Sequence, residues 1–160
     1  MKETVQIDDF LKTGHFGKNG EIQYGMNRQF FIQLLGESKW TMKSRKSSHP
    51  EIYKYDKVEF YFEKGEHGRL FGIQIKPSIN SAPLLKLRID YHFIDPNLQF
   101  ENSIECLKSN AIEFDLINFK YDDENAPQRI LTSGNVELIF DDGLILEKVS
   151  KFVELPKTEL

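Results

Sequence analysis

One two-strand pattern occurs twice in this chain of 160 residues, once near the middle and once near the end. The first copy spans residues 53–62 and 70–75 with a glycine-bearing turn between them, and the second spans residues 131–140 and 144–149 with Asp-Asp-Gly between them. Both copies place Val-Glu before an apolar run that ends in Phe, and an amphipathic stretch precedes each. The repetition predicts an internal duplication of one unit, a helix plus an antiparallel meander.

The composition favours a sheet-rich fold. Thirteen Phe and six Tyr bring the aromatic content to 12%, and aromatic side chains fit the half-buried surface of a pleated sheet. The length suits one compact domain. We therefore predict an α+β fold and a single domain over residues 1–160. Its two similar units, residues 1–76 and 84–155, pack together and are joined by a proline-bracketed linker at 77–83.

Hydrophobic spacing assigns the expected elements. Helical spacing predicts a helix over residues 4–11, a second between an Asn27 N-cap and Gly36 in the αL conformation, and a third over residues 103–112. Polar residues predict a loop over 39–50. Period-2 alternation is clearest over residues 85–93. Further strands are expected at 52–55, 58–62, 70–75, 129–132, 136–140 and 144–152.

The compartment is inferred from cysteine usage and hydropathy. A lone cysteine, Cys106, has no partner for an internal disulfide, and the first nine residues are too acidic for a signal peptide. No apolar run reaches the length of a membrane span. We expect a cytoplasmic protein with no membrane association.

Charge is distributed unevenly between the two halves. Residues 1–80 carry 13 Lys and Arg against 10 Asp and Glu, whereas residues 81–160 carry 8 against 15. An acidic surface attracts basic partners and repels nucleic acid, so we expect a protein partner, such as a basic toxin domain, and no nucleic acid. The residues expected to contact this partner are Asp122, Asp123, Glu124, Glu137, Asp141 and Asp142.

The chain lacks the spacings that catalysis or metal binding require. No H-E-x-x-H, paired C-x-x-C, phosphate-binding loop or G-x-S-x-G motif occurs. His15, His49 and His67 lie beside Gly or Pro and are expected to be exposed, and Cys106 is expected to be a small buried hydrophobe. We predict no enzyme, no cofactor and no metal; the acidic clusters also suit turns.

One strand offers an alternative site. Lys86, Arg88, Asp90 and His92 share the polar face of the strand expected over residues 85–93. Side chains two residues apart on one face can converge on a small ligand or a substrate. An ordinary solvated face explains the same pattern, since antiparallel sheets commonly leave one face in water.

Several motifs in the first half resemble a family of small bacterial proteins. That family carries "FL-x-x-G-x-F-G", "G-M-x-x", "L-L-G-E-P", "Y-K-Y-G" and "E-F-x-F" in order, and a weaker "S-G-V-x-L-x-F" strand near its end. The matching residues here are 9–17, 25–28, 34–37, 52–55, 58–62 and 133–140. The chain departs from the pattern at Ser38, Asp56 and Asn135. The resemblance implies a bacterial origin, an α+β architecture and an association with toxin immunity, and it assigns no site residue.

Together these observations predict a non-enzymatic cytoplasmic protein-binding module. Its expected role is that of an antitoxin-like immunity protein that neutralises a toxin by direct binding. Two alternatives stay open: a small-ligand-binding protein or enzyme that uses the polar face of residues 85–93, and a structural domain that forms homo-oligomers. The protein is then a monomer or a homodimer.

Overall fold

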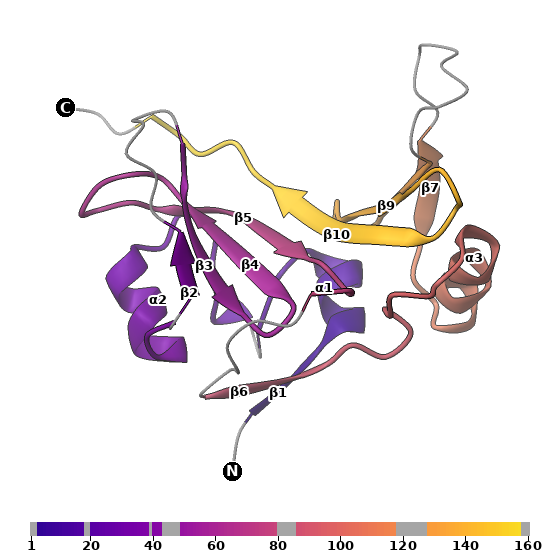
Figure 1. Cartoon of the computed structure of the whole chain (residues 1–160), viewed down its shortest axis with the longest axis horizontal. Coiled ribbons are helices and arrows are strands. Elements are labelled where there is room, and N and C mark those ends of the chain that lie inside the picture. Colours follow the sequence, from indigo (N-terminus) through magenta and orange to yellow (C-terminus); the bar gives the residue numbers. More distant parts are fainter. Residues whose placement is uncertain are drawn as a thin grey trace.

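The structure is a computed structural model, and it describes residues 3–17, 20–38, 40–42, 49–79, 86–117 and 128–157. These residues form ten strands and three helices, and Figure 1 shows how they are arranged. The helices are α1 (Ile7–Thr13), α2 (Arg28–Leu35) and α3 (Phe100–Ser109). The strands are β1 (Glu3–Gln6), β2 (Trp40–Met42), β3 (Glu51–Tyr55), β4 (Val58–Phe62), β5 (Leu70–Ile75), β6 (Leu87–Asp90), β7 (Phe114–Ile117), β8 (Arg129–Thr132), β9 (Glu137–Phe140) and β10 (Leu146–Phe152).

Eight of the strands form one antiparallel sheet in the order β2-β3-β4-β5-β10-β9-β8-β7. Each half of the chain supplies a four-stranded meander, and the two meanders join where β10 pairs with β5, with Val149 opposite Ile75. The α+β class is therefore confirmed. A helix precedes a meander in both halves, and the duplication of one unit stays a prediction.

A second, two-stranded sheet connects the chain's beginning to its second half. β1 and β6 pair in parallel, with Val5 opposite Ile89. This pairing corrects the helix expected over residues 4–11, because residues 3–6 are extended and only Val5 among them is buried. α1 then begins at Ile7 and ends at Gly14, whose φ of 75° gives the αL conformation that glycine adopts without strain.

The three helices pack on the same face of the large sheet (Figure 1). From α2, the Phe31 ring lies 4.7 Å from that of Phe60 and 4.9 Å from that of Phe62. The Phe100 ring of α3 meets Phe140 edge-on at 5.3 Å. These buried rings place the hydrophobic core between the helices and one face of the sheet.

α1 is attached to the turn between β8 and β9 by backbone contacts. The Gly134 N–H donates to the Leu11 carbonyl at 3.1 Å, and the Thr132 hydroxyl donates to the same carbonyl. A Cβ at Gly134 would stand 2.3 Å from the Gly14 nitrogen, so only glycine allows this approach. The contact holds an element of the first half against the second meander.

Several expected boundaries need correction. Of the strand expected over 85–93, residue 85 lies outside the described residues and Leu87–Asp90 form β6. The strand ends there because the Asp90 carboxylate accepts the His92 N–H at 3.0 Å and turns the chain. The expected loop over 39–50 contains β2, which pairs with β3. Gly36 ends α2, but its φ of 87° and ψ of 168° are not αL.

Other expectations were closer. Strands 58–62, 70–75 and 129–132 are confirmed as β4, β5 and β8, and the Asn27 side chain caps α2 by accepting the Gln29 N–H. The helix expected over 103–112 runs from Phe100 to Ser109, and β7 was not expected. Residues 80–83 of the expected linker lie outside the described residues.

Two neighbouring phenylalanines of α2 test where the core lies. Phe31 is fully buried among four aromatic rings, whereas Phe30 is 66% exposed. We expect Phe31→Ala to lower the free energy of unfolding by about 3–5 kcal/mol. The matched change Phe30→Ala should stay within about 0.5 kcal/mol, and urea unfolding followed by circular dichroism measures both. Equal losses in the two variants would contradict this placement of α2.

Candidate functional site

The other face of the large sheet carries no helix in the described part of the chain, and we call it the open face (Figure 1). Side chains that alternate with the core positions of β4, β5, β8, β9 and β10 reach this face. The registers of the ladders arrange them in three rows that run across the strands. Since the rows combine residues from both halves of the chain, they exist only in the folded sheet.

The aromatic row consists of Phe152, Phe71 and Tyr61. The Phe152 ring lies 5.0 Å from Tyr61 and 6.1 Å from Phe71. It covers Gly72, where a Cβ would stand 2.2 Å from the ring. Phe152 is nevertheless 48% exposed. The row is an aromatic cluster that water still reaches.

The middle row consists of Glu137, Ser150, Gln74, Glu59 and Lys54, which follow one another in register across five strands. Glu59 is only 5% exposed. Its carboxylate lies 2.7 Å from the Lys76 ammonium and accepts a hydrogen bond from the Tyr61 hydroxyl at 3.4 Å. Gln74 in turn donates to that hydroxyl at 3.3 Å. This network fixes the centre of the open face.

The same network makes the Tyr61 hydroxyl a poor acid. Burial raises the pKa of Tyr61 first, and the neighbouring Glu59 carboxylate raises it further. Tyr61 is therefore a neutral hydrogen-bond donor and acceptor at physiological pH. It does not have the ionised form that a catalytic phenolate would need.

The basic row consists of Arg129, Ile139, Lys148 and Lys76. Ile139 stands opposite Arg129 on one side and Lys148 on the other, and Lys76 follows the last residue of β5. Arg129 pairs with Glu137 at 2.9 Å, and Lys76 with Glu59. Two hollows of about 300 and 310 Å³ border this row, and they share Gln74 and Lys148. We call the joined hollows the open-face groove.

The acidic residues expected to bind a partner do not form one cluster among the described residues. Glu137 lies in the middle row, whereas Asp141 and Asp142 lie in the turn before β10. The Asp141 carboxylate accepts the N–H groups of Gly143 and Ile145 at 2.9 and 3.0 Å, which is a turn-forming role. Asp122, Asp123 and Glu124 lie outside the described residues.

The alternative set at β6 is spread over several contacts. Lys86 donates to the Gln33 carbonyl at 2.9 Å, and Arg88 is exposed. His92 lies in the turn after β6 with a φ of 49°, and its Nδ1 is 3.1 Å from the Asp8 carboxylate. Asp90 accepts the His92 N–H. The described contacts of these residues therefore lead to different neighbours, and they do not converge on one point.

The remaining candidates for chemistry are not grouped. His15, His49 and His67 are exposed, as expected. Cys106 is half-buried against the core, and burial is the main cause that raises the pKa of its thiol. No group of three or more His, Cys, Asp or Glu that could hold a metal occurs among the described residues.

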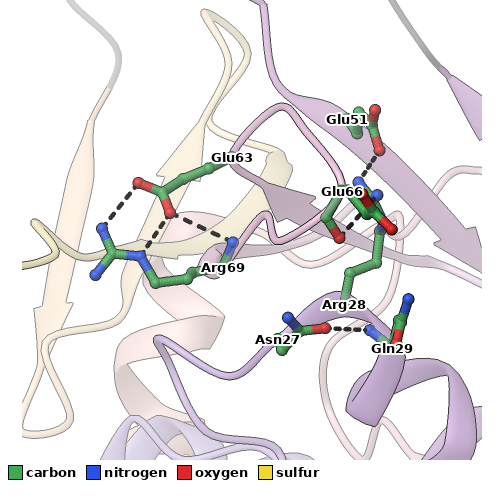
Figure 2. Close-up of polar contacts among 7 residues, drawn as sticks. All are labelled: Asn27, Arg28, Gln29, Glu51, Glu63, Glu66 and Arg69. Carbon is green, nitrogen blue, oxygen red and sulfur yellow. Dashed lines mark hydrogen bonds and ion pairs between the residues drawn. The ribbon is translucent and has the colours of Figure 1, made fainter. Parts of the chain in front are cut away.

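A second polar cluster lies where α2 begins (Figure 2). Arg28 forms an ion pair with Glu51, and both side chains are largely buried. Arg69 binds Glu63 through Nε at 2.7 Å and Nη2 at 3.1 Å, and its Nη1 donates to the Pro156 carbonyl at 2.8 Å. The first pair links α2 to β3, and the contacts of Arg69 link the β4–β5 hairpin to the segment that follows β10. Because each of these charged side chains is paired with another side chain of the same protein, we assign this cluster a structural role.

Comparisons with known proteins define the fold and no activity. No protein-family model matches the chain, and no curated protein matches it. A solved structure of a DUF4309 family protein (YjgB) from Bacillus subtilis subsp. subtilis str. 168 is similar, with a TM-score of 0.50 and 9% sequence identity over 92% of this chain and 93% of that chain. At this identity the similarity concerns the fold alone.

A second similar structure is an extracellular protein containing a SCP domain from Bacillus anthracis str. Ames. Its TM-score is 0.42 and its identity 14%, over 81% of this chain and 43% of that one. Independently of these comparisons, the described helices are all too short or too polar to span a membrane.

The open face was missed at the sequence level for a specific reason. Within β4, Glu59 and Tyr61 alternate with the buried Val58 and Phe60, but the register between β5 and β10 is set in three dimensions and is not encoded in either strand alone. Residues 146–152 show no polar–apolar alternation, since the apolar Leu146, Val149 and Phe152 are three residues apart, so the sequence alone does not assign Lys148, Ser150 and Phe152 to one face.

The second polar cluster gives a pH-dependent prediction. The hydrogen bonds from Arg69 hold the pKa of Glu63 below its usual value in the folded chain. The ion pair therefore stabilises the fold fully above the usual pKa of a glutamate, and this stabilisation is lost as the pH falls through the lowered pKa. We expect Glu63→Gln to lower the melting temperature at neutral pH. The difference from the parent should close as the pH falls through this lowered pKa, where the Glu63 carboxyl becomes protonated and both side chains are neutral.

Thermal unfolding across this pH range measures the effect. Glu66→Gln is the matched control, since Glu66 in the same hairpin contributes its backbone carbonyl, at 3.5 Å from Arg28. A deficit of Glu63→Gln that is constant with pH would show that the ion pair does not stabilise the fold.

Proposed function

We propose that this chain is a non-enzymatic protein-binding module whose partner docks on the open face. The observation that carries the proposal is the aromatic row, because Phe152, 48% exposed, joins Tyr61 and Phe71 in the middle of an uncovered sheet. Aromatic side chains in such positions are typical of the energetic centre of protein interfaces. The surrounding polar rows resemble an interface rim.

The open face supplies most of the area that a stable complex needs. Strands about 4.8 Å apart make an eight-stranded sheet roughly 38 Å wide. Strands of about five residues add roughly 17 Å in the other direction, which gives roughly 650 Å². A standard interface buries about 800 Å² of accessible area per partner. The flat area of the face is somewhat smaller than this, so a partner that covers the whole face also contacts the loops around it to bury a standard interface.

The finer form of the proposal is an antitoxin-like immunity protein of the bacterial cytoplasm. Its support is the motif resemblance in the first half of the sequence and the single cysteine. In this form the bound partner is a toxin, and docking on the open face blocks its activity. The homo-oligomer alternative places a second copy of the chain on the same face.

Site-specific photo-crosslinking in host cells tests the docking face. A photoreactive phenylalanine analogue replaces Phe152 in one variant and Phe30, exposed on α2 across the sheet, in the control. We expect a discrete crosslinked product from position 152 and none from position 30. Mass spectrometry then identifies the product. A crosslink to a second copy establishes the homo-oligomer, and equal or absent crosslinking at the two positions rules out the open face.

Growth assays separate the immunity form from other binding roles. The crosslinked partner is expressed alone, with the parent chain, or with Phe152→Asp, which places a charge in the aromatic row. Immunity predicts arrested growth with the partner alone, rescue by the parent and loss of rescue in the variant. A partner that does not affect growth would remove the immunity role and leave protein binding.

A further inference from the structure

The open-face groove has a charge opposite to that of the chain. Its lining includes two carboxylates, Glu137 and Glu147, and four basic side chains. Three of these, Lys76, Arg129 and Lys148, place their charge on the open face, whereas the Lys151 ammonium lies on the core side. The whole chain carries a formal charge of −4. A local excess of positive charge in a hollow attracts anionic groups more strongly than the same charges on a convex surface.

Lys148 is the cation in this lining that is available to a ligand. Arg129 is held by Glu137 at 2.9 Å and Lys76 by Glu59 at 2.7 Å. Lys151 reaches through to the core side, where it donates to the Gly134 carbonyl at 3.0 Å and lies over the Tyr24 ring. Lys148 forms no ion pair among the described residues, and both hollows border it.

The aromatic row lies on the same strand as this lysine. Lys148 and Phe152 are four residues apart on β10, which is about 13 Å along the strand. Ser150 and Gln74 lie between them in the middle row and present small polar groups. A ligand that spans this distance meets a cation at one end, hydrogen-bonding groups in the middle and exposed rings at the other end.

We propose that the open-face groove binds an acidic segment of a partner protein that also carries an aromatic or aliphatic side chain. Its carboxylate pairs with Lys148, and its apolar side chain packs on Phe152. This inference rests on the proposed function and names the chemistry of the partner. It differs from the basic partner expected from the acidic second half, because the charges of the groove have the opposite sign.

A peptide fits the groove better than a nucleic acid does. The carboxylates of Glu137 and Glu147 stand among the cations, and Glu59 lies beneath Lys76. A continuous phosphate backbone would approach these carboxylates at every few ångströms, whereas a protein segment can place single charges between them. The aromatic row also suits an apolar side chain next to a carboxylate.

Fluorescence anisotropy with three labelled probes tests the proposal. The first probe is a short peptide in which glutamates alternate with tryptophans, the second replaces every glutamate with glutamine, and the third is a single-stranded DNA oligonucleotide. We expect the acidic peptide to bind at least about tenfold more tightly than the glutamine peptide at low salt. High salt should remove most of that preference.

Charge reversal locates the site. Lys148→Glu should weaken binding of the acidic peptide by about tenfold or more and leave the glutamine peptide nearly unchanged. The control Lys108→Glu reverses an exposed lysine of α3, on the other side of the sheet, and should have no effect beyond its change in net charge. Phe152→Ser should weaken both peptides, because it removes the apolar contact.

Three results would overturn the inference: equal affinity for the acidic and glutamine peptides, an unchanged affinity in Lys148→Glu, or tighter binding of the oligonucleotide than of the acidic peptide. The proposed function is tested separately by crosslinking at position 152. A partner crosslinked there whose binding is unaffected by Lys148→Glu retains the docking face and removes the acidic ligand. If position 152 gives no crosslink and the acidic peptide is not preferred, both the docking face and the acidic ligand are removed.

Discussion

The pairing of β5 with β10 is the contact on which the rest of the structure depends. It brings Ile75 opposite Val149 and Gly72 opposite Phe152, residues that are about half the length of the chain apart in sequence. Without it the two meanders would be separate four-stranded sheets with their inner edges exposed, a state prone to non-specific strand pairing. With it, one continuous sheet has one core on its helical side. The same pairing stacks Phe152 on Gly72 beside Phe71 and Tyr61, so it also forms the aromatic row of the open face.

Because the helices lie on one side of the sheet, alternate side chains of each strand have different roles. Those that face the helices form the core, and those that face the other way are available to a partner. Val58 and Phe60 are fully buried toward the helices, and Glu59 and Tyr61 between and beyond them reach the open face. Antiparallel sheets allow this division because their pairing needs no crossover helix on the second face. The edges of the sheet are short, with three residues in β2 and four in β7. Short edges limit strand addition, which makes the face a more suitable docking surface than the edge.

The sequence predicted those elements that depend on local pattern. β4, β5 and β8 are rich in β-branched, aromatic and other apolar residues and are bounded by turn residues. Asn27 is a typical N-cap residue and stands directly before the amphipathic helix α2. The start of the chain was misassigned because Val5, Ile7, Phe10 and Leu11 fit a helical spacing, while the partner strand of Val5 lies more than eighty residues away. The strand predicted for residues 91–93 is wrong for a related reason. The Asp90 carboxylate accepts the His92 N–H and turns the chain, and hydrophobic periodicity does not encode such a hydrogen bond.

The candidate site was less predictable than the fold, because its parts are ordinary in sequence. Glu137 was chosen for its charge, yet in the sheet it is bound to Arg129 and forms part of a predominantly basic groove. Lys148 stands beside Glu147 in an acidic half of the chain, so its sequence context does not distinguish it from other surface lysines. The net charge of an eighty-residue segment sums side chains that lie on different surfaces of the folded protein, so it does not predict the charge of any one surface. What a partner meets is the local set of side chains that the registers bring together, and strand pairing gives the open face a basic row within an acidic protein.

Carboxylates beneath the basic row have a consequence for selectivity. Glu59 and Glu137 hold Lys76 and Arg129 in place, so these cations are oriented before any partner arrives and less rotamer entropy is lost on binding. They also neutralise much of the charge, which weakens attraction to polyanions in general. A ligand then gains most where it matches the unpaired cation, the small polar groups beside it and the aromatic row together. The arrangement therefore favours a partner of one shape and chemistry over any ligand that offers negative charge alone.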